Sequence, residues 1–205
     1  DGPDEELTLT ENAQPALMAV SLATFRVLQH EAGLDLAGKA ACVAGHSLGE
    51  YSALAAAGVF SLKDAASLLK TRGRAMQAAV PVGEGAMAAL LGLDMDQVRA
   101  VAEEASAAGV CEIANDNAPG QVVISGARAA VEQAMVLAKQ AGARRALPLP
   151  VSAPFHCSLM APAAEVMREA LAATDMHAPA VPLMANVSAG LVSDVDTIRQ
   201  GLVQQ

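Results

Sequence analysis

The chain has 205 residues, of which 53% are hydrophobic and 17% charged, and its formal charge at pH 7 is −9. The large apolar fraction excludes a disordered chain, because enough surface is available for burial to offset the entropy lost on folding. The negative charge excludes proteins that hold nucleic acid or membranes through broad basic fields, and an aromatic content of 2% excludes base-stacking platforms. Alanine dominates the apolar residues, which is typical of helices packed closely on a sheet, so we expect an acidic α/β protein.

No segment reaches the roughly 18 consecutive apolar residues that a membrane span requires. The N-terminus is acidic, whereas a signal peptide begins basic and then becomes apolar. Cys42, Cys111 and Cys157 are far apart and match neither metal-ligand spacing nor a disulfide framework. We therefore expect a cytoplasmic protein with reduced thiols and no metal site.

Helical periodicity dominates the first part of the chain. Side chains of one pattern recur every three or four residues at Leu17, Val20, Thr24 and Leu28, and Gly33 follows as a stop signal. The predicted elements of this part are helices at 13–31, 47–57 and 61–80 and a buried strand at 40–44.

The middle of the chain, residues 83–150, predicts the order βαββαβ, which is typical of a ferredoxin-like subdomain. The predicted strands are 86–93, 111–114, 121–125 and 145–149, and the predicted helices are 94–108, with Asp94 as N-cap, and 127–141. A turn-rich segment from Asn115 to Gly120 joins the two central strands.

The last part predicts a helix at 158–173, a strand at 181–185 and a terminal helix from residue 195. Together these patterns predict an α/β body, formed by residues 1–82 and 151–205, with a hydrolase-like parallel sheet and flanking helices. The ferredoxin-like subdomain, residues 83–150, would be inserted into this body.

The strongest local motif is Gly45-His46-Ser47-Leu48-Gly49. This G-x-S-x-G pattern lies between a predicted strand and a predicted helix, which is the context of a nucleophile elbow, although an ordinary turn remains the alternative. In an elbow a strained turn exposes the serine hydroxyl, and the two glycines let the backbone approach closely. Ser47 is therefore the predicted nucleophile, and the Leu48 N–H at the helix N-terminus is the predicted oxyanion donor.

A serine nucleophile requires a base, and four histidines are present. Three have simpler explanations: His30 ends a predicted helix, His46 adjoins the nucleophile, and His177 lies in a proline-flanked loop. His156 follows the point where the small subdomain returns to the body, where a loop can lie over the mouth of a sheet. Spacing alone leaves a catalytic and a structural role for His156 equally open.

The chain resembles the malonyl-CoA:acyl-carrier-protein transacylases of fatty acid synthesis. The segments that carry the resemblance are QPAL (14–17), GHSLGEYSAL (45–54), RG (72–73), GAMAA (85–89), NAPGQVVI (117–124), ALPLPV (146–151) and PFHC (154–157). The resemblance implies that Ser47 is the nucleophile, His156 the general base and Arg72 the malonate-binding arginine. A planar guanidinium is also the natural bidentate partner of a free carboxylate. The alternative is that Arg72 is an exposed arginine on a helix, with no role in binding.

The resemblance further implies a ping-pong reaction that moves malonyl from malonyl-CoA, through a serine ester, to the phosphopantetheine thiol of acyl carrier protein, with no cofactor. The partners would be the carrier and the coenzyme A thioester, and the protein would be a monomer. By analogy Asn115 and Asn117 face the substrate cleft, and Arg144 and Arg145 form a patch for coenzyme A or the carrier. The alternative for the two asparagines is an ordinary turn without a function, and the alternative for the two arginines is a solvated pair at the end of a strand.

The resemblance is incomplete at both ends. The family begins with a strand and a Gln-rich turn that nothing here matches, and it ends with a segment that orients the histidine, which Gln204 and Gln205 do not match. We therefore expect that the chain is truncated at both ends and that these residues alone have impaired or no activity. Malonyl and methylmalonyl remain open as the acyl group.

Two other functions stay open. An esterase- or lipase-like α/β hydrolase shares the elbow, but its acid candidates Asp94, Asp96 and Asp116 all fall in the small subdomain, which disfavours it. A non-catalytic module that docks a carrier protein is the other alternative.

Overall fold

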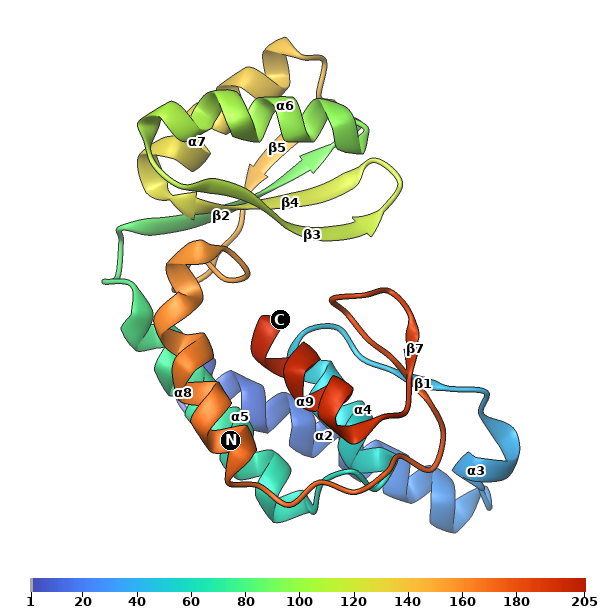
Figure 1. Ribbon diagram of the computed structural model, residues 1–205. Coiled ribbons are helices and arrows are strands. Elements are labelled where there is room, and N and C mark those ends of the chain that lie inside the picture. Colours follow the sequence, from blue (N-terminus) through green and yellow to red (C-terminus); the bar gives the residue numbers. More distant parts are fainter. Residues whose placement is uncertain (1) are drawn as a thin grey trace. The chain divides into compact units, whose positions relative to one another are not determined.

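The computed structural model describes residues 2–205, and the chain divides into two compact units that are described separately (Figure 1). One unit comprises the residues up to 75 together with 164–205, and the other comprises residues 76–163. Within residues 2–205, no helix combines the length and the apolar character needed to cross a membrane. The architecture is mixed α/β.

The first unit surrounds a small sheet with helices. Its elements are α1 (Asp4–Leu7), α2 (Thr10–Glu31), α3 (Leu36–Lys39), β1 (Val43–Ala44), α4 (Leu48–Ala56), α5 (Leu62–Ala79), α8 (Ala161–Ala172, after the short 3-10 helix η2, Ser158–Met160), β6 (Leu183–Met184), β7 (Leu191–Val192) and α9 (Val195–Gln204), where α5 ends and α8 begins in the second unit. The sheet has the order β1-β6-β7, in which β1 and β6 are parallel and β6 and β7 antiparallel.

The sheet of the first unit differs from the parallel sheet that the sequence predicts. Only β1 and β6 run parallel, because β7, which the sequence analysis missed, follows β6 through a short connection that requires an antiparallel return. The strand predicted at 40–44 is limited to Val43 and Ala44, and Ala44 is exposed, so the prediction of a buried strand is wrong for that residue.

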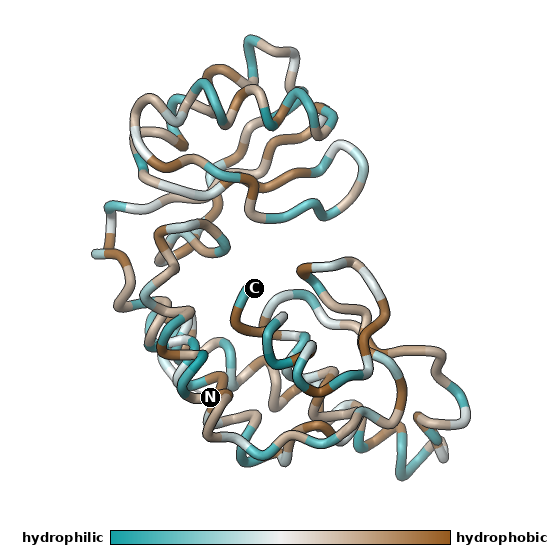
Figure 2. Tube along the Cα trace, in the orientation of Figure 1, coloured by the Kyte–Doolittle hydropathy of each residue, from teal (hydrophilic) through white to brown (hydrophobic). Residues whose placement is uncertain are grey.

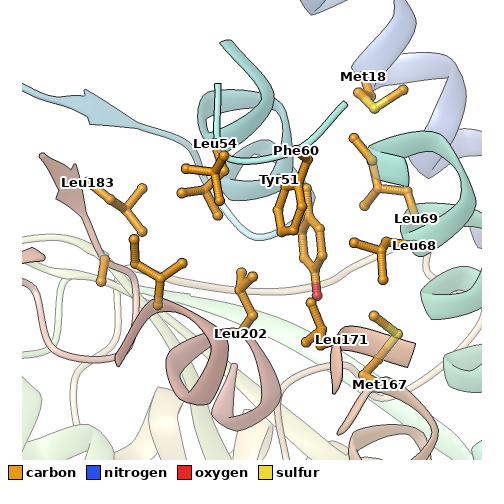
Figure 3. Close-up of a cluster of buried hydrophobic side chains, with 14 of the residues drawn as sticks. Met18, Tyr51, Leu54, Phe60, Leu68, Leu69, Met167, Leu171, Leu183 and Leu202 are labelled. Carbon is orange, nitrogen blue, oxygen red and sulfur yellow. The ribbon is translucent and has the colours of Figure 1, made fainter. Parts of the chain in front are cut away.

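The core of the first unit brings residues from distant segments together (Figure 3). Tyr51 and Leu54 of α4, Leu69 of α5, Leu171 of α8 and Leu183 of β6 are all fully buried. The Tyr51 ring stacks on Phe60 with 6.2 Å between the ring centroids, and Figure 3 shows its hydroxyl pointing toward Leu171. The helix that follows the elbow is therefore anchored in the core along one face.

The helix predicted at 13–31 is present as α2, but the face assigned to it is wrong. Leu17, Val20 and Leu28 are 54%, 67% and 45% exposed. The buried face instead carries Thr10, Gln14, Met18 and Leu22. Two of these residues are polar and are satisfied inside the protein, since Gln14 Nε2 donates to Thr10 Oγ1 at 2.9 Å, so an analysis of apolar periodicity overlooks this stripe.

The second unit alternates strands and helices. Its elements are β2 (Gly85–Leu91), α6 (Met95–Ala105), the 3-10 helix η1 (Ser106–Ala108), β3 (Cys111–Ala118), β4 (Gln121–Ala127), α7 (Arg128–Gln140) and β5 (Arg145–Pro148). The strands form an antiparallel sheet in the order β3-β4-β2-β5, and Figure 1 shows α6 and α7 on one side of it.

The core of the second unit lies between this sheet and its two helices. Leu90, Val98, Ile124 and Ala134 are fully buried there. Figure 2 shows hydrophilic and hydrophobic residues alternating along α6, which is typical of a helix with one face on a core. The predicted N-cap of α6 is confirmed, because the Asp94 carboxylate accepts the Gln97 N–H in a capping box.

The hairpin between β3 and β4 corrects the predicted turn. Residues 115–118 continue β3, so the loop is confined to Pro119 and Gly120. Register shifts between Ile113 and Asn115 and between Asp116 and Ala118 absorb the extra residues as bulges. The Asn- and Asp-rich composition that predicts a long turn therefore belongs to a bulged strand.

Candidate active site

The G-x-S-x-G motif forms a sharp turn between β1 and α4, as the sequence predicts. The Gly49 N–H donates to the His46 carbonyl at 2.9 Å, and Ser47 has φ 52° and ψ −113°. These angles are close to those of the first central position of a type II′ turn, which glycine usually occupies. The nucleophile candidate therefore has the strained backbone that a nucleophile elbow requires.

The two glycines of the motif have different roles. A Cβ on Gly45 would lie 1.9 Å from the Gly49 carbonyl oxygen, so the chain closes this turn only with glycine at position 45. A Cβ on Gly49 would meet no atom within 4 Å beyond its chain neighbours and the backbone of its own helix, so the expectation that both positions need glycine for space is wrong for Gly49. Leu48 is the first residue of α4, and its N–H has no acceptor within the helix.

Arg72 reaches the nucleophile from α5. Its side chain is buried, with 4% of the residue exposed, so the alternative of an exposed helix arginine is wrong. Nη1 donates to Gln14 Oε1 at 2.9 Å, and Nη2 donates to Ser47 Oγ at 3.1 Å and to Gln205 Oε1 at 2.8 Å. The guanidinium also lies over the Tyr51 ring, 5.7 Å from its centroid.

The surroundings of Arg72 are unusual for a cation. Its acceptors are a hydroxyl and two amide oxygens, all of them neutral. Burial lowers the pKa of Arg72, while the nearby Tyr51 and Glu50 oppose that shift. A substrate carboxylate at this position would give the guanidinium the bidentate anionic partner that it is built to bind.

Three residues near the elbow were missed by the sequence analysis. Gln205, which the sequence analysis set aside because its context does not match the family's last segment, lies beside Arg72 and donates through Nε2 to Glu50 Oε2. Glu50 is 2% exposed, and burial raises its pKa, while hydrogen bonds from Asn186 and Gln205 lower it. Asn186 contacts the elbow itself: Oδ1 accepts the Ser47 N–H at 2.9 Å and Nδ2 donates to the Gly45 carbonyl at 2.7 Å.

His156 belongs to the second unit and lies between β5 and η2. It is half-buried and has φ 59°, a strained value for a residue with a side chain. The loop around it is anchored within that unit on both sides. Before His156, the Pro154 ring packs against Gly85 so closely that a Cβ on Gly85 would lie 2.3 Å from Pro154 Cδ. After it, the Glu112 carboxylate accepts hydrogen bonds from both the N–H and the hydroxyl of Ser158, each at 2.7 Å.

The other predicted site residues also lie in the second unit. Asn115 lies opposite Val123 of β4, and Asn117 lies at the second register shift of β3, between Asp116 and Ala118. Arg144 and Arg145 are exposed at the start of β5. The structure therefore brings Ser47, Leu48 and Arg72 together in the first unit and distributes the rest over the second.

Cys157, next to His156, is held as a thiol. Its Sγ–H donates to the Pro154 carbonyl at 3.2 Å, and burial raises its pKa. Among residues 2–205, no group of three His, Cys, Asp or Glu side chains is placed to hold a metal ion.

Comparison with known proteins gives concordant similarities. A family profile described as "Acyl transferase domain" matches residues 1–199. The malonyl CoA-acyl carrier protein transacylase of Escherichia coli K12 is 50% identical over 205 residues, which cover 100% of this chain and 65% of that protein.

Solved structures show the same relation. The acyl-carrier-protein S-malonyltransferase of Bartonella henselae superposes with a TM-score of 0.95 at 58% identity, over 100% of this chain and 65% of that one. A type II PKS acyl-carrier protein in complex with its malonyl-transacylase gives a TM-score of 0.94 at 44% identity, with the same coverage. The chain thus spans 65% of the length of these relatives.

Proposed function

The chain belongs to the acyl transferase domain family, and from that premise we propose that it moves a malonyl group from malonyl-CoA to the phosphopantetheine thiol of an acyl carrier protein. The observation that carries the proposal is the buried Arg72, whose Nη2 donates to Ser47 Oγ at 3.1 Å. A cation so close to the nucleophile fits an acyl group that ends in a carboxylate, and it does not fit the neutral acyl chain of an esterase substrate.

The proposed reaction has two half-reactions. Ser47 Oγ attacks the thioester carbonyl, its proton passes to His156, and the coenzyme A thiol leaves with that proton, so that malonyl-Ser47 remains. The carrier thiol then attacks the ester, His156 accepts the thiol proton, and Ser47 regains a proton as it leaves. The Leu48 N–H stabilises the oxyanion of each tetrahedral intermediate. The reaction needs no cofactor.

The second unit supplies the remaining proposed roles. We propose that residues 83–150 form a ferredoxin-like subdomain within a body formed by 1–82 and 151–205, supported by the βαββαβ order and the antiparallel sheet β3-β4-β2-β5. Asn115 and Asn117 would contact substrate. Arg144 and Arg145, both exposed, would attract the phosphates of coenzyme A or the carrier, in a monomer that acts in the cytoplasm.

Loading with labelled malonyl-CoA tests the proposal. We expect a malonyl adduct on Ser47, detected by intact mass and peptide mapping, and no adduct in Ser47→Ala. Arg72→Ala should slow malonyl loading by about 10²-fold or more, because truncating one partner of a buried charge pair costs roughly 2–5 kcal/mol. Acetyl loading should change much less.

Arg74→Ala is the matched control, because Arg74 lies on the same helix, is exposed and pairs with Glu11 instead. Its malonyl loading should equal that of the unaltered protein. The proposal is wrong if malonyl-CoA leaves no adduct on Ser47. The role of Arg72 is wrong if malonyl and acetyl loading fall equally.

A further inference from the structure

The side chain of Asn186 holds the backbone on both sides of the elbow. Its Oδ1 accepts the N–H of Ser47 at 2.9 Å, and its Nδ2 donates to the carbonyl of Gly45 at 2.7 Å. Asn186 is 139 residues away from Ser47 in the sequence and lies in the connection between β6 and β7. One amide group therefore bridges the entry and the apex of the turn that carries the nucleophile.

A closed ring of contacts connects Asn186 to the arginine of the site. The Asn186 N–H donates to Glu50 Oε2 at 3.3 Å, and Gln205 Nε2 donates to the same oxygen. Gln205 Oε1 accepts from Arg72 Nη2 at 2.8 Å, and Nη2 also donates to Ser47 Oγ at 3.1 Å. The ring thus begins at the backbone of Ser47 and returns to its side chain.

The elbow needs such support because its backbone is strained. A residue with a side chain at φ 52° and ψ −113° lies in a sparsely populated region, at a cost of about 1–3 kcal/mol, and it keeps that conformation only where its surroundings over-determine it. Asn186 is exposed overall, so water competes for the same two backbone groups. Separate waters satisfy each group, but they do not fix the distance between them.

We propose that Asn186 is a positioning residue for the nucleophile: its side-chain amide locks the Ser47 backbone so that Oγ faces the acyl group, and Glu50 holds the backbone N–H of Asn186 in place. The proposal rests on the proposed function, in which Ser47 is acylated. Since the Ser47 N–H is engaged by Asn186, the Leu48 N–H is left as the donor of the elbow to the oxyanion.

The first experiment measures the reactivity of Ser47 without coenzyme A or carrier. The protein is treated with a fluorophosphonate, and the rate of labelling at Ser47 is followed by mass spectrometry and divided by the folded fraction. We expect Asn186→Ala to slow labelling by about 10- to 100-fold, because a small displacement of a reacting atom has effects of this size.

Asn12→Ala is the matched control. Asn12 also makes two side-chain hydrogen bonds in the first unit, donating to the Glu6 carbonyl at 2.8 Å and accepting from Lys70 at 2.7 Å, but neither contact involves the elbow. Asn12→Ala should therefore leave the labelling rate per folded molecule unchanged, even if it lowers the free energy of unfolding.

A second variant, Asn186→Asp, separates positioning from general stability. The ionised carboxylate accepts the Ser47 N–H but cannot donate to the Gly45 carbonyl, whereas the protonated form can do both. The ratio of the variant rate to the unaltered rate should therefore rise as the pH falls. Glu50, Arg72 and His46 are the neighbouring titratable or charged groups, and they are common to both proteins, so their effects largely cancel in the ratio.

The proposal is wrong if the labelling rate per folded molecule of Asn186→Ala equals that of the unaltered protein, so that any slower labelling reflects only a loss of folded protein. It is also wrong if the ratio of the Asn186→Asp rate to the unaltered rate does not vary with pH. Failure of the proposed function is recognised separately, since it is the absence of a malonyl adduct on Ser47 in the unaltered protein. Absence of fluorophosphonate labelling in the unaltered protein would overturn the positioning proposal alone, because the proposed function is judged by the malonyl adduct.

Discussion

At the scale of single residues, Glu50 is a buried acid whose charge state changes with pH. Burial raises its pKa, and hydrogen bonds from Asn186 and Gln205 oppose that shift without cancelling it. The folded state therefore retains this proton to higher pH than the unfolded chain does. The stability that Glu50 contributes is present below the pKa of an unfolded glutamate, about 4.3, and is lost as the pH rises through the raised pKa.

We expect Glu50→Gln to remove this loss. The free energy of unfolding of the variant minus that of the unaltered protein should become more positive as the pH rises from about 4.3 toward neutrality, as measured by urea denaturation. Glu165→Gln is a control of opposite sign at lower pH, because hydrogen bonding to Arg168 lowers the pKa of Glu165. Its difference should become more negative as the pH rises from that lowered pKa to about 4.3 and stay constant above it. A difference that is constant across pH for Glu50→Gln would contradict the assignment.

At the scale of elements, the spacing of α2 and α5 determines where Arg72 meets Gln14. Gly73 allows this spacing, since a Cβ there would lie 2.5 Å from the Glu11 Cα and 2.7 Å from the Thr10 carbonyl oxygen. Both are backbone atoms, so neither can rotate away. The hydrogen bond from Arg72 Nη1 to Gln14 Oε1 spans the same pair of helices.

Gly73→Ala should therefore separate the two helices and lower the free energy of unfolding by about 1–3 kcal/mol. Gly201→Ala is the matched control within α9, where an added Cβ meets no atom within 4 Å beyond its chain neighbours and the backbone of its own helix, and φ is not positive. It should raise the free energy of unfolding by roughly 0.5–1 kcal/mol. Urea denaturation measures both, and equal effects would refute the close contact at Gly73.

Local signals in the sequence were sufficient for many elements and for part of the site. The N-cap of α6 was predictable because Asp94 and Gln97 are three residues apart, and the elbow because its glycines and serine lie within five consecutive residues. Asn186 and Gln205 were not predictable in this way. Their contacts with Ser47 and Arg72 join residues 139 and 133 positions apart, and a lone amide leaves no periodic pattern.

At the scale of the whole molecule, residues 2–205 form two hydrophobic cores, one in each compact unit. Leu54 belongs to the first core and Leu90 to the second, and both are fully buried. The residues of each core all belong to one unit, so we expect each unit to unfold cooperatively. The net charge of −9 is also a property of the whole chain, so the anionic substrates of the proposed reaction would have to be held by local cations.

Truncation of each core should act mainly on its own unit. Leu90→Ala should destabilise by about 2–5 kcal/mol and should lower hydrogen-exchange protection more in residues 76–163 than in the first unit. Leu54→Ala should show the reverse pattern. Hydrogen exchange followed by mass spectrometry provides the measurement, and equal loss of protection in both units after either change would mean that they unfold together.

The backbone conformation of Ser47 makes thermal stability and the proposed reaction compete. Glycine adopts φ 52° and ψ −113° easily, and serine does so at a cost of about 1–3 kcal/mol. A directed-evolution campaign scored only on thermal survival would therefore favour glycine at position 47 and yield a sturdier, inert protein. Selection of stabilised variants therefore has to include an assay of turnover, because a residue that strains the backbone is the one that the proposed reaction requires.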